Sequence, residues 1–159
     1  ILKKNNDCEF HIIGKYYEDD KSSIKFKELN KFIKENNKIK YFGFVEDSKK
    51  YYEQSTCIIL PSYREGLSKS LLEASSMSRP VIATDVPGCN DIVQHDFNGY
   101  LSKVRDTQSL ISSIELFLDQ SYERKIIMGN NSRKIVENKF KIDLVISKYL
   151  KRIKDIIKS

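Results

Sequence analysis

Several features that mark a protein's class are missing from this chain of 159 residues. No apolar run approaches the roughly 20 residues that a membrane-spanning helix needs. The first residues, ILKKNNDCEF, lack the apolar segment of a secretory signal peptide. There is no tract of low complexity and no repeat of solenoid length. The composition, 40% hydrophobic and 31% charged, is typical of a soluble globular protein.

Cysteine is scarce as well. The three cysteines, Cys8, Cys57 and Cys89, are odd in number and far apart, so they form no metal-binding or redox motif. The simplest interpretation is a reduced, cytoplasmic location. A peripheral position at the inner face of the membrane is compatible with it. Cys57 begins an apolar run and is expected to be a small core residue.

Two short motifs of nucleotide enzymes are also missing. No Asp-x-Asp pair and no cluster of metal ligands occurs, so we expect no metal cofactor. No G-x-G-x-x-G sequence follows a predicted strand, and the glycines are isolated, which argues against a dinucleotide-binding dehydrogenase.

Hydrophobic periodicity divides the chain into alternating strands and helices. Short apolar runs predict strands near residues 9–13, 39–43, 57–60, 81–84 and 99–101. Helical spacing predicts helices over residues 22–36, 48–54, 107–119, 121–138 and 142–158. Ser22 or Ser23 is the expected cap of the first helix, Asp106 caps the one from 107, and Asn98-Gly99 suggests a tight turn. The alternation predicts an α/β fold, a Rossmann-like parallel sheet with helices on both faces.

The most informative stretch runs from Cys57 to Gly88, CIILPSYREGLSKSLLEASSMSRPVIATDVPG. An apolar run closed by Pro61 predicts a buried strand, and a loop follows. Apolar residues from Leu67 onward recur with helical spacing, and Arg79-Pro80 ends that helix because the residue before proline avoids the α region. The loop therefore lies at the carboxyl end of a strand, where open α/β sheets bind ligands.

Two glutamates bracket the start of this helix. Glu65 stands just before it and Glu73 two turns into it, and eight helical residues rise about 12 Å, roughly the span from sugar to ribose in a nucleotide sugar. Free N–H groups at Gly66, Leu67 and Ser68 would favour a diphosphate between them. In a plainer alternative, Glu65 complements the helix dipole and Glu73 is a solvated surface residue.

The order of motifs along the chain adds a resemblance to a known family. The motifs are Leu60-Pro61-Ser62-Tyr63-Arg64-Glu65-Gly66-Leu67, Leu72-Glu73-Ala74 and Arg79-Pro80-Val81-Ile82-Ala83-Thr84-Asp85-Val86-Pro87-Gly88, with Gly43-Phe44-Val45 upstream and Asn98-Gly99-Tyr100-Leu101 and Asp106 downstream. Together they resemble the C-terminal, donor-binding domain of retaining GT-B glycosyltransferases of the family 4, or group 1, type. That family's mark is two glutamates separated by seven residues, as Glu65 and Glu73 are.

The resemblance implies roles for the matching residues. Glu65 would contact the hydroxyls of the donor sugar and, as the catalytic residue, steady the oxocarbenium-like centre. The backbone N–H groups of Gly66, Leu67 and Ser68 would bind the sugar and the phosphates. Glu73 would accept hydrogen bonds from the ribose hydroxyls.

The same resemblance points to the nucleotide base and to the reaction. The loop with Phe44 and Val45 would reach the base, although an ordinary strand-to-helix loop fits those residues equally well. The implied reaction is transfer of a hexose or N-acetylhexosamine from a nucleotide sugar, UDP-linked first and GDP-linked next, to a glycan or lipid-linked acceptor. The setting would be bacterial surface polysaccharide or lipopolysaccharide synthesis, without a metal.

Two departures from the family accompany the match. An Arg and a Lys that hold the diphosphate in relatives would precede Ile1, as would the first strand-helix unit and the acceptor domain. We therefore expect residues 1–159 to be one nucleotide-sugar-binding domain, excised from a longer protein, whose partner is its own missing N-terminal domain. Without that domain, we expect these 159 residues to catalyse no sugar transfer. The turn also reads Glu65-Gly66-Leu67-Ser68 where many relatives have Glu-Gly-Phe-Gly.

Two other functions stay open. One is a non-catalytic module that binds a nucleotide sugar. The other is a basic interaction domain whose C-terminal helix, rich in lysine, contacts a membrane surface, although a solvated helix face is the plainer interpretation. Nucleic acid is not an expected partner, because no RNA-binding aromatic motif occurs and acids interleave with the basic residues of the first fifty positions.

Overall fold

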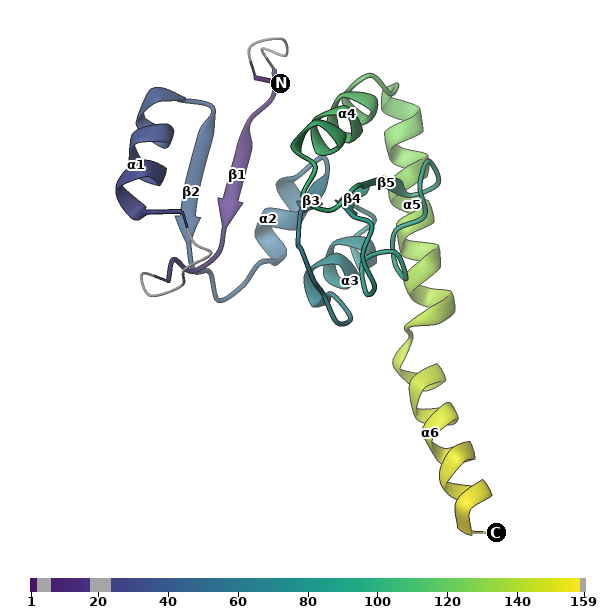
Figure 1. Cartoon of the computed structure of the whole chain (residues 1–159). Helices are drawn as coiled ribbons and strands as arrows, with labels where there is room; N and C mark the ends of the chain where they lie inside the picture. The colour runs from purple at the N-terminus through teal and green to yellow at the C-terminus, as the bar shows by residue number, and fades with distance from the viewer. Residues whose placement is uncertain (3–6, 18–23, 158–159) are drawn as a thin grey trace. The chain divides into compact units, whose positions relative to one another are not determined.

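The computed structural model describes residues 1–2, 7–17 and 24–157, which divide into two compact units, Ile1–Ser48 and Lys49–Ser159 (Figure 1). Each unit has a parallel sheet of its own. The predicted α/β class and the parallel pairing are confirmed, and the ends of the predicted strands fall within one residue of the observed ones.

The first unit is a small sheet with one helix. Its elements are β1 (Phe10–Ile13), α1 (Phe26–Glu35) and β2 (Ile39–Gly43). α1 begins after Lys25, whose side chain makes no capping bond, and the expected caps Ser22 and Ser23 lie outside the described residues. No residue of α1 is buried, and among the described residues of this unit Ile39 alone is buried. The strands are therefore well formed, but little core surrounds them.

The second unit contains the main core. Its elements are α2 (Lys49–Gln54), β3 (Ile58–Leu60), α3 (Lys69–Ser76), β4 (Val81–Thr84), β5 (Gly99–Ser102), α4 (Thr107–Leu118), α5 (Tyr122–Lys139) and α6 (Ile142–Ile157). The strands pair in the order β3-β4-β5, with β4 in the centre. α3 packs against β3, β4 and α5, and α4 packs against β4 and β5.

Burial of β4 shows that helices cover both faces of this sheet. Val81 and Ala83 are fully buried in one cluster with Leu71 and Ala74 of α3. Ile82 points to the opposite face, since strand side chains alternate, and it is fully buried as well. A strand buried on both faces reads as a continuous apolar run, which is why this strand could be located from sequence.

The turn that the sequence suggests at Asn98-Gly99 lies one step earlier, because the turn residues end at Asn98 and Gly99 is already the first residue of β5. Gly99 begins β5 and lies so close to β4 that an added Cβ would be 1.6 Å from the carbonyl oxygen of Val81. The buried Asn98 amide donates to the carbonyl of Ile92 (3.2 Å) and to the Ser132 hydroxyl of α5 (3.1 Å). Besides closing the turn, the pair thus serves close packing of the sheet and of α5.

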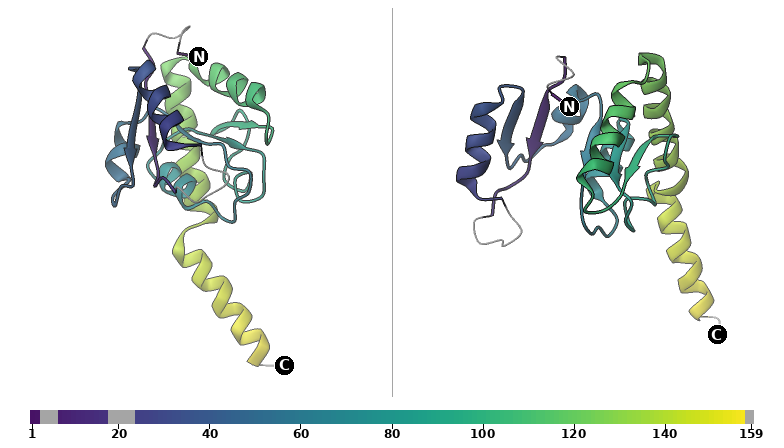
Figure 2. Two further views of the ribbon diagram at one scale, coloured as in Figure 1. Left: turned by 60° about the vertical axis from the view of Figure 1, so that its left-hand side comes forward. Right: turned by 45° about the horizontal axis from the view of Figure 1, so that its top comes forward.

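The C-terminal helix α6 has no buried residue and extends beyond α5 in both views of Figure 2. Its apolar residues are all exposed or half-buried, and Lys148, Lys151, Arg152 and Lys154 lie among them. Among the described residues, no helix is long and apolar enough to cross a membrane. The membrane contact considered from sequence stays a prediction.

Candidate functional site

The loop after β3 places Glu65 at the carboxyl edge of the three-stranded sheet. The Ser62 hydroxyl donates a hydrogen bond to the Glu65 carboxylate, 2.7 Å away. The Thr84 hydroxyl, at the end of β4, donates in turn to the carbonyl of Ser62. This chain of contacts fixes the half-buried Glu65 relative to the two strand ends, as a site on a sheet edge requires.

The following loop, after β4, packs directly on this one. Gly88 has a positive φ of 83°, and a Cβ added to it would lie 1.3 Å from the carbonyl oxygen of Gly66. The N–H of Gly88 donates to the Asp91 carboxylate at 3.3 Å, which holds the turn. Only glycine accommodates both the left-handed backbone and the close approach, so the position of the Glu65 loop depends on residue 88.

Cys89, which follows Gly88 in this second loop, is affected by burial and by the charge of Glu65. The fully buried thiol of Cys89 has its pKa raised to about 11, mainly by burial and further by the Glu65 carboxylate. Since both the low dielectric and a neighbouring negative charge disfavour a thiolate, Cys89 is a protonated core residue at neutral pH.

The helix after the loop starts later than the sequence suggests. α3 begins at Lys69, and Ser68 is its N-cap, with its hydroxyl accepting from the N–H of Leu71 at 3.4 Å. Leu67, expected on the helix, is 54% exposed in the loop. Gly66, Leu67 and Ser68 therefore supply loop and capping N–H groups, whereas the first turn itself begins with the N–H groups of residues 69 and 70.

Glu73 consequently lies one turn, not two, into the helix. From Lys69 to Glu73 an α-helix rises about 6 Å, and the rest of the separation from Glu65 is loop. The prediction of eight helical residues between the two glutamates is wrong. A capped helix start still lies between them, and its unsatisfied N–H groups favour an anion there.

The carboxylate of Glu73 lies beside a tyrosine hydroxyl and a lysine ammonium. The Tyr52 hydroxyl of α2 donates to Oε2 at 3.3 Å, and the Lys69 ammonium lies 3.5 Å from Oε1. Tyr52 is buried, whereas the side chain of Lys69 is 90% exposed. Glu73 is itself 38% exposed, so it is neither a buried core residue nor a freely solvated one.

Phe44 and Val45, the residues predicted to lie near the nucleotide base, follow β2 in the other unit. Phe44 is 69% exposed, and Val45 is half-buried. Their role at the base stays a prediction.

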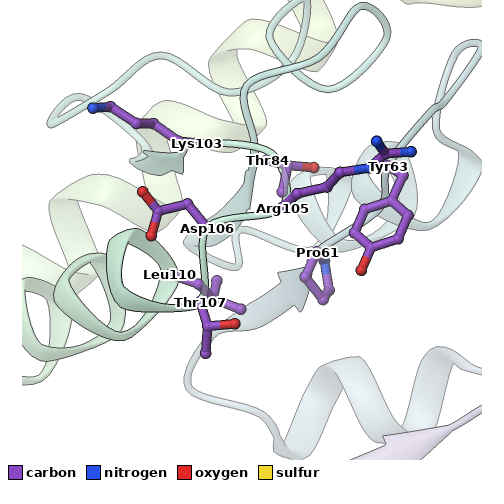
Figure 3. Close-up of a pocket in the computed structure, with 8 residues that line it drawn as sticks. All are labelled: Pro61, Tyr63, Thr84, Lys103, Arg105, Asp106, Thr107 and Leu110. Atoms are coloured by element: carbon purple, nitrogen blue, oxygen red, sulfur yellow. The ribbon is translucent and has the colours of Figure 1, made fainter. Parts of the chain in front are cut away.

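A cavity of about 310 Å³ lies beside the Glu65 loop, at the ends of β3, β4 and β5 (Figure 3). Its lining includes Tyr63, Thr84 and Arg105. Arg105 has a positive φ of 58°, and its guanidinium carbon lies 5.4 Å from the centre of the Tyr63 ring. Figure 3 shows the guanidinium extending toward Tyr63 while Lys103 points the other way. A left-handed backbone costs a non-glycine residue free energy, so the surrounding structure must hold Arg105 in this conformation at the edge of the cavity.

The fold and this arrangement can now be compared with known proteins. Residues 1–120 match the family model described as Glycosyl transferases group 1. The chain belongs to this family. The capsular polysaccharide biosynthesis glycosyltransferase CapM of Staphylococcus aureus is 30% identical over 114 residues, 72% of this chain and 30% of CapM.

A second group 1 relative is a UDP-Gal:alpha-D-GlcNAc-diphosphoundecaprenol alpha-1,3-galactosyltransferase of Escherichia coli. It is 27% identical, and the match covers 96% of this chain and 46% of that enzyme. The chain therefore spans less than half the length of either relative.

The solved structures agree on the fold. Anabaena HepE in complex with UDP superposes with a TM-score of 0.81 at 20% identity, over 93% of this chain and 41% of HepE. The fold of this group 1 chain is thus that of one half of a GT-B glycosyltransferase.

Several residues of the site could not be assigned from the motifs. Tyr52 reaches Glu73, and Thr84 reaches the Glu65 loop, through contacts between segments more than 20 positions apart, and Arg105 joins the cavity from the segment after β5. Ser62 lies in the same loop as Glu65, and the motif gave it no role. Gly88 lay within a recognised motif, and its glycine was the available signal of a close backbone approach.

Proposed function

We propose that this chain is the donor-binding half of a retaining glycosyltransferase that transfers a hexose or N-acetylhexosamine from a nucleotide sugar to a glycan or lipid-linked acceptor. The setting is bacterial surface polysaccharide synthesis. The observation that carries the proposal is the capped start of α3 between Glu65 and Glu73, at the carboxyl edge of a parallel sheet. Such a helix end suits the diphosphate, and each glutamate accepts hydrogen bonds from hydroxyl groups at one end of the nucleotide sugar.

The mechanism follows from where charge develops. Departure of the nucleoside diphosphate places negative charge on its leaving oxygen, and N–H groups aimed there lower the barrier. Residues 66–70 supply those groups, assisted by basic side chains. Glu65 holds the sugar hydroxyls and steadies the positive charge at the anomeric carbon. Glu73 binds the ribose.

UDP is the proposed nucleotide. The Escherichia coli relative is named for UDP-Gal, and the fold neighbour HepE is described in complex with UDP. We propose further that no metal is needed, because the helix end and cations meet the phosphate charge. UDP affinity should then be the same in EDTA as in magnesium, and a requirement for magnesium would contradict this point.

Calorimetric titration with UDP, GDP and ADP tests the nucleotide site. Glu73→Gln should weaken binding of the preferred nucleotide by about 1.5–3 kcal/mol, since charge-assisted hydrogen bonds are lost. Glu53→Gln is a matched control, because Glu53 also pairs with a lysine four residues earlier, at 3.9 Å, but lies on the exposed face of α2. Equal effects of the two substitutions would reject the ribose role.

A longer form of the protein separates catalysis from binding. If it transfers sugar from the same nucleotide that the 159-residue chain binds, the enzyme proposal holds. If the longer form binds the nucleotide sugar but transfers no sugar, so that Glu65→Gln changes no activity, the non-catalytic module becomes the better account. Absence of binding by both forms would reject the donor site itself.

A further inference from the structure

A buried tyrosine connects the core to the nucleoside end of the site. Tyr52 is 8% exposed and belongs to the same apolar cluster as Leu71 and Ala74. Its hydroxyl emerges at Glu73 and donates to Oε2 at 3.3 Å. A tyrosine combines a large apolar body with one polar group, so it can anchor in a core and still orient a surface carboxylate.

Tyr52 and Lys69, which both contact Glu73, differ in how firmly they are held. Lys69 lies 3.5 Å from Oε1, but its side chain is 90% exposed, and exposed ion pairs of this kind contribute little. The Tyr52 ring is fixed by packing against the cluster below α3. Of these two contacts, the tyrosine hydroxyl is therefore the one that restricts the rotamers of Glu73.

We propose that Tyr52 is a positioning residue, which holds the Glu73 carboxylate in the orientation that receives the ribose hydroxyls. The inference rests on the proposed function, in which Glu73 binds the ribose. Each carboxylate oxygen has two acceptor sites, so Oε2 can keep the tyrosine bond and accept a ribose hydroxyl as well. A carboxylate oriented before binding loses less rotamer entropy when the ligand arrives.

The test compares two tyrosines and two ligands. Tyr52→Phe keeps the ring in the core and removes only the hydroxyl, and Tyr51→Phe is the matched control on the same helix. Each variant is titrated with UDP and with 2′,3′-dideoxyuridine 5′-diphosphate, which lacks both ribose hydroxyls. Tyr52→Phe should raise the Kd for UDP about three- to tenfold and leave the Kd for the dideoxy ligand unchanged. Tyr51→Phe should change neither.

A second arm places Tyr52→Phe in a Glu73→Gln background. If the tyrosine acts through Glu73, it should have no further effect on UDP there, because the two residues form one coupled unit. An equal loss for both ligands, or an unchanged Kd for UDP in Tyr52→Phe, would overturn the inference and leave the proposed function standing. Wild-type chain that binds UDP and the dideoxy ligand equally would instead overturn the ribose role of Glu73, and the inference with it.

Discussion

The two ends of the candidate site are built in different ways. Glu65 lies in a loop whose position depends on other segments, through Ser62, Thr84 and the close contact at Gly88. Glu73 lies on a capped helix and accepts a hydrogen bond from a core tyrosine. The Glu65 end is therefore held by tertiary contacts between loops, and the Glu73 end by a helix that packs on the core.

This difference means that the two ends can be disturbed separately. A change between the loops should move Glu65 while α3, packed on β4 and α5, keeps Glu73 in place. The four changes that follow alter the contact between the loops, the Glu65 end, the shared helix start and the neighbouring core residue Cys89.

The largest effect is expected from Gly88→Ala. The new Cβ would meet the backbone of Gly66, and the positive φ adds strain, so the free energy of unfolding should fall by about 2–3 kcal/mol. Chemical denaturation measures this. Gly66→Ala is the control, since its Cβ would meet nothing within 4 Å, and it should change stability by less than about 1 kcal/mol. Similar losses from both would refute the loop-packing account.

Glu65→Gln should distinguish binding of the donor sugar from binding of the nucleotide. We expect the variant to bind UDP as the wild type does but to lose any extra affinity for the matching UDP-sugar, by about 1.5–3 kcal/mol if charge-assisted bonds are involved. Parallel titrations with UDP and UDP-sugars measure the difference. A drop in affinity for UDP alone would show that the two ends are not independent.

Ser68→Ala should weaken the helix start that both ends share. Its hydroxyl caps α3 by accepting from the N–H of Leu71, and loss of such a cap costs about 1 kcal/mol. Thermal melting of the variant, beside Ser112→Ala at an exposed position of α4, gives the comparison. If the two serines behave alike, the cap does not stabilise the helix.

The smallest effect at neutral pH is expected from Cys89. Its thiol has a folded pKa of about 11 against an ordinary value of 9.0, so the unfolded chain loses the proton first as the pH rises. Stability should be intact below pH 9 and decline between about pH 9 and 11. Cys89→Ala should reduce that decline, in denaturation curves at pH 7 to 11. An unchanged decline would place its cause elsewhere, for example at Cys57, whose pKa burial also raises.

Much of the fold was predictable because local signals agreed with it. The run at residues 81–83 is apolar without interruption, and Asp106 caps α4 by accepting from the N–H of Ser109, as expected. α5 was located, and its apolar residues Met128 and Ile135 are buried, but they form only part of its buried face. Ile126 is 46% exposed, while the small polar residue Ser132 is fully buried. Hydrophobic periodicity cannot reveal a face that is packed through satisfied hydrogen bonds.

The site was predictable only in part. The motifs located Glu65 and Glu73, but Leu67 was wrongly placed on the helix because its spacing to Leu71 fits one. The capping bond at Ser68 decides the true start of α3. The contact of Tyr52 with Glu73 could not be predicted, since the two residues are 21 positions apart in the sequence. Contacts of this kind follow from tertiary packing, and local patterns do not encode them.

The central claim is that the start of α3, between Glu65 and Glu73, binds a nucleotide diphosphate. The most direct test is a titration of the isotope-labelled chain with UDP, followed by amide NMR shifts. We predict the largest shifts at residues 65–70 and at Glu73, with α6 unaffected. Shifts concentrated on the lysines and arginine of α6, or at Arg105 alone, would contradict the claim and move the nucleotide to a different surface.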